Sequence, residues 1–444
     1  MVNDLRELLR RDAASPPHDD LDIATVLAGG RRRLRRRRVA AFGGTALATG
    51  ALVVTASLAG LTGGKPDFVA AGVPRPDAPT LRLADAVEAV EGTTYRELAS
   101  YTNENLNRDN GQYFDGVTDD GLILFRDGPR MDQLWPRFAL MDPATGEKDW
   151  LPDLDIGQTQ TWPLELGEDS LTLLGAKGDM SAEVVAYIFD RDDQQWETMK
   201  WPALPATGNV FGAQLGPDDR LYVPVPKTQG EPPPGGWPVG PDGEADDADA
   251  EGDTYRLWSA SLTDPSDVRD EGLTVGSVAF TGQSMVWTDS TNGGAGRVHV
   301  RDLETGEEHA FDPQSGEKCN LLSFGATDDR IVMGQYCGTY DDGVRDDRVQ
   351  VLDTDGKQVV TLQGSGIEGT VTSTSGAGVV TVTSHEPEGA GTYIYDLDSG
   401  RFLRITDDTS SWATSGPTQD GQFLWNTPEN RSRGMTQHLG ELID

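Results

Sequence analysis

Histidine is scarce in this 444-residue sequence, and its five copies are scattered along the chain. They are His18, His299, His309, His385 and His438. No pair of them stands at the short spacing with which zinc sites are built. His299 alternates with two valines, so we expect it on the opposite face of a strand from the core. The sequence therefore predicts no metal site.

Cysteine is rarer still, with only Cys319 and Cys337. The residues between them predict a β-hairpin whose turn is centred on Asp328. In that register Phe324 faces Val332, and the two cysteines stand directly opposite each other. Opposite residues of an antiparallel pair have Cα atoms about 4.5–5.5 Å apart, a distance that a disulfide spans. We predict a Cys319–Cys337 disulfide, formed in an oxidising compartment.

Catalytic and cofactor motifs are also missing. The sequence contains no Gly-x-Ser-x-Gly and no phosphate-binding glycine loop. Two acidic stretches, 353–356 and 396–400, resemble pieces of a calcium loop, but the complete pattern with its downstream glutamate is absent. Hairpin turns explain them better, and segment 418–425 fails the spacing of the sialidase Asp box. We predict no catalytic residue, no cofactor and no enzyme activity.

Basic residues are few outside the first 38 positions. From residue 39 onward 27 basic side chains stand against 67 acidic ones, a net charge of −40, whereas residues 1–38 carry a net +4. A domain this acidic repels phosphate backbones, so nucleic acid is excluded as a partner.

One long stretch, residues 39–61, contains neither charge nor proline. As a helix it would be about 35 Å long, enough to cross a hydrocarbon core of about 30 Å. Seven arginines lie within residues 31–38 and favour the cytoplasmic side. We predict a single-pass cell-membrane protein with its N-terminus in the cytoplasm and its C-terminal domain outside. The alternative is a cleaved secretory signal, which delivers the same domain to the same side.

The predicted cytoplasmic tail, residues 1–38, resembles those of many actinobacterial single-span proteins. It lacks the His-x3-Cys-x2-Cys signature of zinc-binding anti-sigma domains, and it contains no cysteine. Residues 62–92, rich in Gly, Pro, Ala and Asp, predict a linker with a short helix between Leu83 and Val90.

From residue 93 a repeat begins, in which a turn of Asp or Gly precedes a short apolar strand. The middle residues of the seven turns are Asp120, Asp169, Asp219, Gln283, Asp329, Ala377 and Asp420. Their spacings are 49, 50, 64, 46, 48 and 43 residues. Each unit then continues with strand, tight Asp/Gly turn and strand, as in FALMD-PATG-EKDWL. Four short strands in a unit of about 40–50 residues are typical of a β-propeller blade.

Residues 93–444 therefore resemble the WD-repeat-like and TolB-like β-propellers of exported bacterial proteins. The resemblance rests on the repeat period and on the x-D-G-x-L-x-F turn and strand, and the His and Trp-Asp pair of eukaryotic WD repeats is missing. We expect an all-β, seven-bladed β-propeller after the transmembrane helix, with six blades as the alternative.

Two segments stand out from the repeat. The seventh unit has only three strands of its own, so we expect residues 94–101 to pair with residues 436–443 and close the ring. The longest interval contains residues 224–253, rich in Pro, Gly and acid, which predict a disordered insertion in the third blade.

Together these features predict a membrane-anchored binding or protein-interaction module. Its partner is an extracytoplasmic protein or a small ligand that the sequence does not identify. One alternative is transmembrane signalling, in which residues 1–38 contact a cytoplasmic regulator such as a sigma factor. A second alternative is a hydrolase or lyase with its site in the mouth of the ring.

Overall fold

The computed structural model describes residues 78–443 with internal gaps. The gaps are residues 104–110, 129–135, 155, 157–159, 178–182, 208–211, 229–251, 292–295, 315–319, 340–344, 365–366, 368–377, 385–388, 409–415 and 431–433. The predicted tail and transmembrane span lie outside the described residues and remain predictions. Among the described residues, no helix has the length and apolar character needed to cross a membrane.

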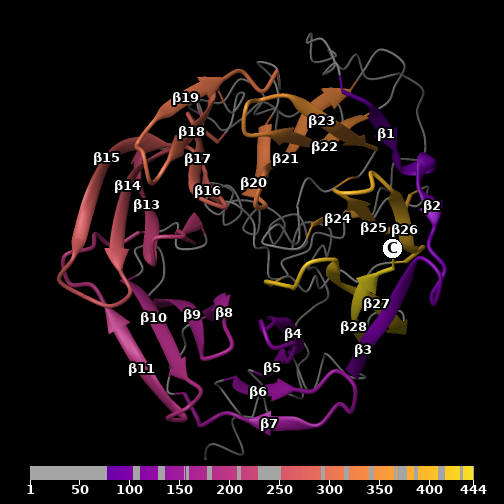
Figure 1. Cartoon of the computed structure of the whole chain (residues 1–444), viewed down its shortest axis with the longest axis horizontal. Helices are drawn as coiled ribbons and strands as arrows, with labels where there is room; N and C mark the ends of the chain where they lie inside the picture. The colour runs from indigo at the N-terminus through magenta and orange to yellow at the C-terminus, as the bar shows by residue number, and fades with distance from the viewer. Residues whose placement is uncertain are drawn as a thin grey trace, which may run out of the picture. The chain divides into compact units, whose positions relative to one another are not determined.

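The described residues form seven β-sheets, which lie as blades around a common centre (Figure 1). The predicted all-β, seven-bladed propeller is confirmed, and the six-bladed alternative is wrong. We number the blades in chain order, beginning with the sheet that contains β4.

Blades 1 to 4 each contain four antiparallel strands in chain order, with the first strand toward the centre and the last at the rim (Figure 1). Blade 1 is β4 (Gln112–Val117), β5 (Ile123–Asp127), β6 (Arg137–Met141) and β7 (Lys148–Trp150); blade 2 is β8 (Gln160–Leu166), β9 (Ser170–Lys177), β10 (Glu183–Asp190) and β11 (Gln195–Lys200). Blade 3 is β12 (Gln214–Leu215), β13 (Arg220–Thr228), β14 (Thr254–Ser261) and β15 (Val268–Val275); blade 4 is β16 (Val278–Thr281), β17 (Ser284–Thr288), β18 (Val298–Asp302) and β19 (Glu308–Phe311).

Blades 5 to 7 also take strands from the N-terminal side of the chain. Blade 5 is β20 (Asn320–Ala326), β21 (Arg330–Thr339), β22 (Arg345–Asp353) and β23 (Gln358–Gln363), with β1 (Thr80–Arg82) added; blade 6 is β24 (Val379–Ser384), β25 (Gly391–Asp396) and β26 (Phe402–Thr406), with β2 (Val87–Glu88) added. Blade 7 is β27 (Gln422–Asn430), β28 (Gly434–Leu442) and β3 (Tyr95–Asn103).

The predicted turns of blades 1 to 5 join the first strand to the second, and in blades 6 and 7 the predicted turns precede the first described strands, β24 and β27. We call these seven turns the inner turns. A second set, the outer turns, joins the third strand to the fourth. The two sets are hydrogen-bonded to each other, so they share one face of the ring: the amide of Arg191 donates to the Asp169 carbonyl (3.0 Å) and that of Leu397 to the Gly378 carbonyl (2.9 Å). We call this face the turn face.

In blades 5 and 6 the outer turn is closed by an aspartate at the end of the strand before it. Asp396 Oδ1 accepts from the amides of Asp398 and Ser399, both at 3.1 Å, and Gly400 follows with φ of +69°. Asp353 likewise accepts from the amides of Asp355 (3.0 Å) and Lys357 (2.8 Å). Both stretches that resembled calcium loops are therefore hairpin turns.

The core is divided among the contacts between neighbouring blades. One cluster joins blades 1 and 2 through Leu124, Phe138, Leu173 and Tyr187, and Leu124 and Leu173 are less than 2% exposed. The strands of a propeller are covered on both faces, which explains uninterrupted apolar runs such as LILF at 122–125.

Ring closure follows the prediction. Strand β3 pairs antiparallel with β28, with Tyr101 opposite Gln437, Ala99 opposite Leu439 and Tyr95 opposite Leu442. A strand from the start of the propeller thus supplies the outer strand of the last blade and removes an open edge.

The predicted linker differs from the structure over residues 80–88. These residues form β1 and β2, which pair parallel with β23 and β26. The helix expected between Leu83 and Val90 is limited to a 3-10 turn, Leu83–Asp85. The predicted insertion is also shorter at its start, because β13 continues to Thr228.

The hairpin in blade 5 has a different register near its turn. Phe324 pairs with Met333 and not with Val332, because the turn has an even number of residues. A bulge at Leu322 then adds one residue, so that Asn320 pairs with Tyr336 as expected. Cys319 lies outside the described residues, so the disulfide remains a prediction.

Candidate functional site

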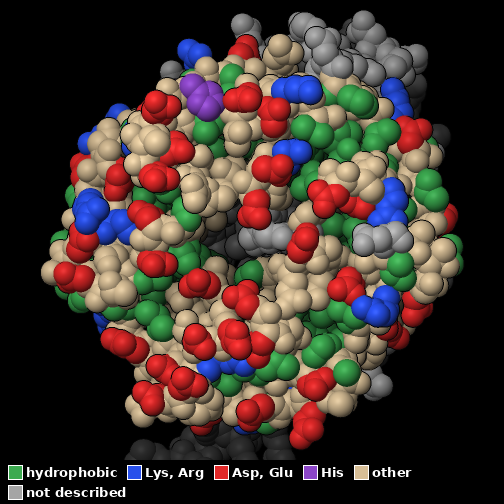
Figure 2. Space-filling view, in the orientation of Figure 1, with side chains coloured by type: hydrophobic (Ala, Val, Ile, Leu, Met, Phe, Trp, Pro, Cys, Tyr) green, Lys and Arg blue, Asp and Glu red, His purple; other side chains and the backbone are tan. Residues whose placement is uncertain are grey.

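The inner turns bring carboxylates together at the centre of the turn face. They include Asp119, Asp120, Glu168, Asp169, Asp218, Asp219, Asp328, Asp329 and Asp420. Figure 2 shows acidic side chains spread over one face of the ring and gathered around its central hollow, with few basic side chains between them. Because the first strand of each blade lies toward the centre, the turn that follows it must lie there too.

Glu165 stands out among these acids because it lies on β8, the innermost strand of blade 2, and is exposed. The pairing of β8 with β9 shifts between Pro163 and Glu165, which marks a bulge at this point. Partial burial raises the pKa of Glu165, and the charges of Asp219 and Asp119 raise this pKa further.

We call Asp119, Glu165 and Asp219 the acidic mouth. The three residues come from blades 1, 2 and 3, and all are exposed. None of them forms an ion pair with a basic side chain of the described residues. Three neighbouring carboxylates without a described counter-ion attract positive charge.

Beside the mouth, Arg191 closes a hollow between blades 1 and 2. Its guanidinium donates to both carboxylate oxygens of Asp120, at 2.8 and 2.7 Å, and to the Gly167 carbonyl at 3.2 Å. The hollow measures about 330 Å³ and is also lined by Asp149 and Glu168. The bonds from Arg191 lower the pKa of Asp120 to about 2. Arg191 is thus a structural link between blades, and its charge is already neutralised.

We predict that Arg191→Ala costs about 1–2 kcal/mol of stability at pH 7. The pKa of Asp120 is depressed by Arg191, so the pair stabilises the fold above the ordinary aspartate pKa and loses this effect as the pH falls toward about 2. Urea denaturation at several pH values measures the change. Arg96→Ala is the control, since it removes an exposed pair with Glu441 and should cost under about 0.5 kcal/mol. Equal losses of stability in the two variants would contradict the assignment of Arg191 as a structural link between blades 1 and 2.

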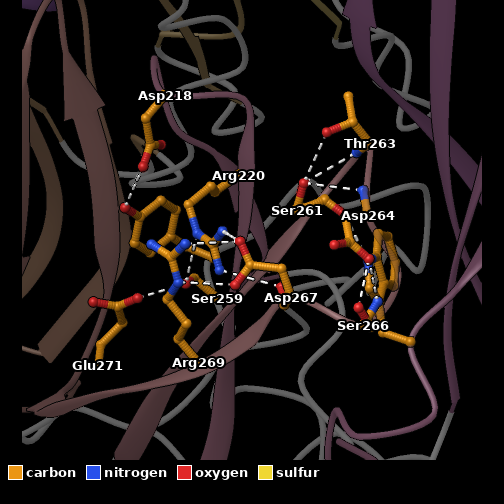
Figure 3. A network of polar contacts seen from close by, with 12 residues as sticks. Asp218, Arg220, Ser259, Ser261, Thr263, Asp264, Ser266, Asp267, Arg269 and Glu271 are labelled. Atoms are coloured by element: carbon orange, nitrogen blue, oxygen red, sulfur yellow. Dashed lines mark hydrogen bonds and ion pairs between the residues drawn. The ribbon is translucent and has the colours of Figure 1, made fainter.

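A second polar network ties the strands of blade 3 together near the turn face (Figure 3). Buried Arg220 donates to Ser259 Oγ at 3.0 Å and to Asp267 Oδ2 at 2.7 Å, and Ser259 donates to Glu271 at 2.5 Å. Arg269 also donates to Asp267 Oδ2, at 2.7 Å. Arg220, and then Arg269, lower the pKa of Asp267. These charges are satisfied within the network, so it orders the outer turn of blade 3 and leaves no free charge for chemistry.

A buried ion pair lies in blade 1. Arg126 donates to both oxygens of Asp115, at 2.6 and 3.1 Å, and stacks on Tyr113 with its guanidinium carbon 4.3 Å from the ring centroid. Asp115 lies in a bulge of the innermost strand β4. Burial raises the pKa of Asp115 more than Arg126 lowers it.

Two of the histidines, at which the sequence predicts no metal site, each stack on a tryptophan and contact a carboxylate. His299 stacks on Trp287 at 4.9 Å and contacts Asp289 at 2.8 Å; His438 stacks on Trp425 at 4.6 Å and contacts Glu97 at 2.7 Å. In both blades the tryptophan on the second strand position faces the histidine on the next strand. A sequence comparison of these two strand pairs could have found this repeated stack, which packs and does not expose a reactive centre.

Metal ligands are not assembled in the residues that the structure covers. No three His, Cys, Asp or Glu side chains there are grouped closely enough to hold a metal ion. The site that remains is the acidic mouth, whose chemistry is attraction of a cationic group.

No protein-family model and no curated protein sequence matches the chain. Among solved structures it is similar to an oligogalacturonate lyase in complex with manganese, with a TM-score of 0.45, 13% identity, and coverage of 81% of this chain and 96% of that one. It is also similar to a prolyl endopeptidase (TM-score 0.42, 14% identity, 77% and 46% coverage). A third structure, an uncharacterized protein from Listeria monocytogenes EGD-e, has a TM-score of 0.37 at 7% identity, with 77% and 88% coverage. Similarity this low carries no statement about a ligand or a reaction.

Proposed function

We propose that the chain is a membrane-anchored extracytoplasmic binding module, and that its acidic mouth takes a lysine- or arginine-rich segment of a partner protein. The observation that carries this proposal is the set of three exposed carboxylates, Asp119, Glu165 and Asp219. Burial, and then the charges of Asp219 and Asp119, raise the pKa of Glu165. A bound cation relieves this repulsion, and the free protein has no described counter-ion that does so.

The strength of such binding is set by several weak contacts. An exposed ion pair contributes about 0.2–1 kcal/mol, so a useful affinity needs several basic side chains acting together on the acidic face. Screening acts over about 8 Å at physiological salt, and added salt should therefore weaken the complex. Binding should strengthen as the pH rises through the raised pKa of Glu165, because only the ionised carboxylate attracts a cation.

The N-terminal part of the chain would tether the binding module to the membrane. The predicted span at 39–61 and the arginines at 31–38 would hold the propeller outside the cell, with residues 1–38 in the cytoplasm. The signalling alternative adds a cytoplasmic regulator that contacts this tail. Nucleic acid is not a partner in either version, because the propeller is strongly acidic.

Catalysis is the second candidate, and one observation favours it. A carboxyl group with a raised pKa in the mouth of a ring suits a general acid, and Glu165 is such a group. Its neighbours in the acidic mouth are two further carboxylates, Asp119 and Asp219, and the described residues contain no cluster that could hold a metal ion, so we prefer binding.

Calorimetric titration of the full chain with an oligolysine peptide tests the proposal. The variant Asp119→Asn/Glu165→Gln/Asp219→Asn should weaken binding at least tenfold, about 1.4 kcal/mol. The matched control is Glu147→Gln/Asp193→Asn/Glu304→Gln, which removes three exposed acids from outer turns and should change affinity less than threefold. Equal loss of affinity in both variants would mean that oligolysine binds through the overall negative charge of the domain and not at the acidic mouth. Turnover of a glycan, peptide or ester that Glu165→Gln abolishes would favour the enzyme.

A further inference from the structure

A strap of chain runs along the rim of the ring before the closing strand. We use this name for residues 78–92, which contain β1 and β2. In Figure 1 the strap is the indigo segment that passes along blades 5 and 6 and leads into β3. Thr80 to Arg82 pair parallel with Thr361 to Gln363, and Val87 and Glu88 pair parallel with Leu403 and Arg404.

The strap is held weakly. None of its residues is buried, and the first buried residue of this part of the chain is Ala99 in β3. Its strands have three and two residues, and Val87 is 63% exposed. A segment with short ladders and exposed side chains opens at low free-energy cost while the rest of the fold stays intact.

The edges beneath the strap, in contrast, are well formed. Leu362 on β23 and Leu403 on β26 are buried, at 0% and 3% exposed. The Thr361 amide donates to the Pro79 carbonyl at 2.9 Å, and the Ala89 amide donates to the Arg404 carbonyl at the same distance. Removing the strap would leave these backbone groups ready to pair with another extended chain.

A socket between the two edges receives an apolar side chain. A Cβ atom on Gly364 would lie 2.7 Å from Leu83, and one on Gly389 would lie 3.0 Å from it, so both glycines keep room for this leucine. Leu81, Leu83 and Ala86 all pack against the cluster shared by blades 5 and 6. The edges therefore select for aliphatic side chains spaced two residues apart as well as for an extended backbone.

We propose that the outer edges of β23 and β26 are a docking surface for an extended segment of a partner polypeptide, and that the strap occupies this surface until the partner displaces it. The partner segment adds parallel to both edges and places one aliphatic side chain between Gly364 and Gly389. The strap acts as a competing intramolecular ligand, so the apparent association constant for the partner is the intrinsic one multiplied by the fraction of molecules in which the strap is open. This surface lies at the rim and is separate from the acidic mouth, so either proposal can fail without the other.

The test uses the full chain and a fluorescent peptide with the sequence of residues 78–90 as the partner probe. Leu81→Asp/Leu83→Asp should release the strap and tighten peptide binding at least tenfold over the wild type. Ala84→Asp/Val90→Asp adds the same charge at exposed positions of the strap and should behave as the wild type. A peptide carrying the two leucine-to-aspartate changes should not bind to any of the proteins.

Hydrogen exchange of residues 78–92 in the same samples reports whether the strap is released. Lost protection together with tighter peptide binding supports the proposal. Lost protection without peptide binding overturns it, and so does a strap that stays protected in the double-leucine variant. A dimer that forms in place of the peptide complex would assign the edges to a second copy of the chain and also contradict the proposal.

Discussion

Deleting residues 63–103 will destroy the folded propeller, whereas deleting residues 63–91 will leave it folded. The longer deletion removes β3, which supplies the outer strand of blade 7 and pairs with β28 from Tyr95 to Asn103. The shorter deletion removes only chain that contains no buried residue in its described part.

The size of the effect follows from the contacts of β3 on both sides. Tyr101 packs against Phe125 of blade 1 with ring centroids 4.9 Å apart, and Tyr95 packs against Trp425 at 5.8 Å. Ala99 is buried in the cluster with Leu439. Losing a strand from a closed sheet exposes both an edge and this apolar surface, and should cost more than about 5 kcal/mol, comparable to the stability of a whole domain.

Size-exclusion chromatography and thermal melting of the two deletion variants measure this effect. The longer deletion should give aggregate or no cooperative transition, and the shorter one should elute and melt nearly as the full chain does. Unchanged melting of the longer deletion would mean that β3 does not close the ring.

Replacing Arg126 by Met will destabilise the protein by about 3–5 kcal/mol at neutral pH, because it leaves the Asp115 carboxylate buried without its partner. The side chains of Arg126 and Asp115 are 14% and 9% exposed. The variant Asp115→Leu/Arg126→Met removes both charges and should recover most of the loss.

The destabilisation caused by Arg126→Met should depend on pH in a definite direction. Burial already raises the pKa of Asp115 in the wild type, and Arg126 opposes the rise. Without Arg126 the pKa of Asp115 rises further, so between the ordinary aspartate pKa and the raised value the folded state holds a proton that the unfolded state has already released. The deficit of Arg126→Met should therefore be small below the ordinary aspartate pKa and grow as the pH rises toward the raised value. Chemical denaturation between pH 4 and 8 tests it, and a deficit that shrinks with rising pH would contradict the pairing.

Periodic features were predictable from the sequence because each is fixed locally. An aspartate or glycine turn before an apolar run recurs seven times, and each recurrence marks the same place in a blade. Closure was predictable because the last unit lacks a strand and one spare strand, residues 94–101, precedes the first unit. These inferences need only local turn chemistry and the rule that sheet edges are paired.

Features that depend on tertiary contacts were not predictable. The bulge at Leu322 changes the register by one residue, and the flanking sequence contains no signal that predicts it. Strand β1 has three residues and pairs parallel with residues 361–363, which lie far away in the sequence. Among 67 acidic residues, the sequence could not say that Asp120 pairs with Arg191, or that the charged neighbours of Glu165 in the described part of the chain are Asp219 and Asp119.

Hydrogen exchange of the full chain with and without bound oligolysine tests most directly whether the acidic mouth is the binding surface. We expect slower exchange at the inner turns of blades 1 to 3 and along β8, and no change on the outer strands β7, β11 and β15. Protection confined to the outer strands, or spread evenly over the acidic surface, would contradict the proposed site.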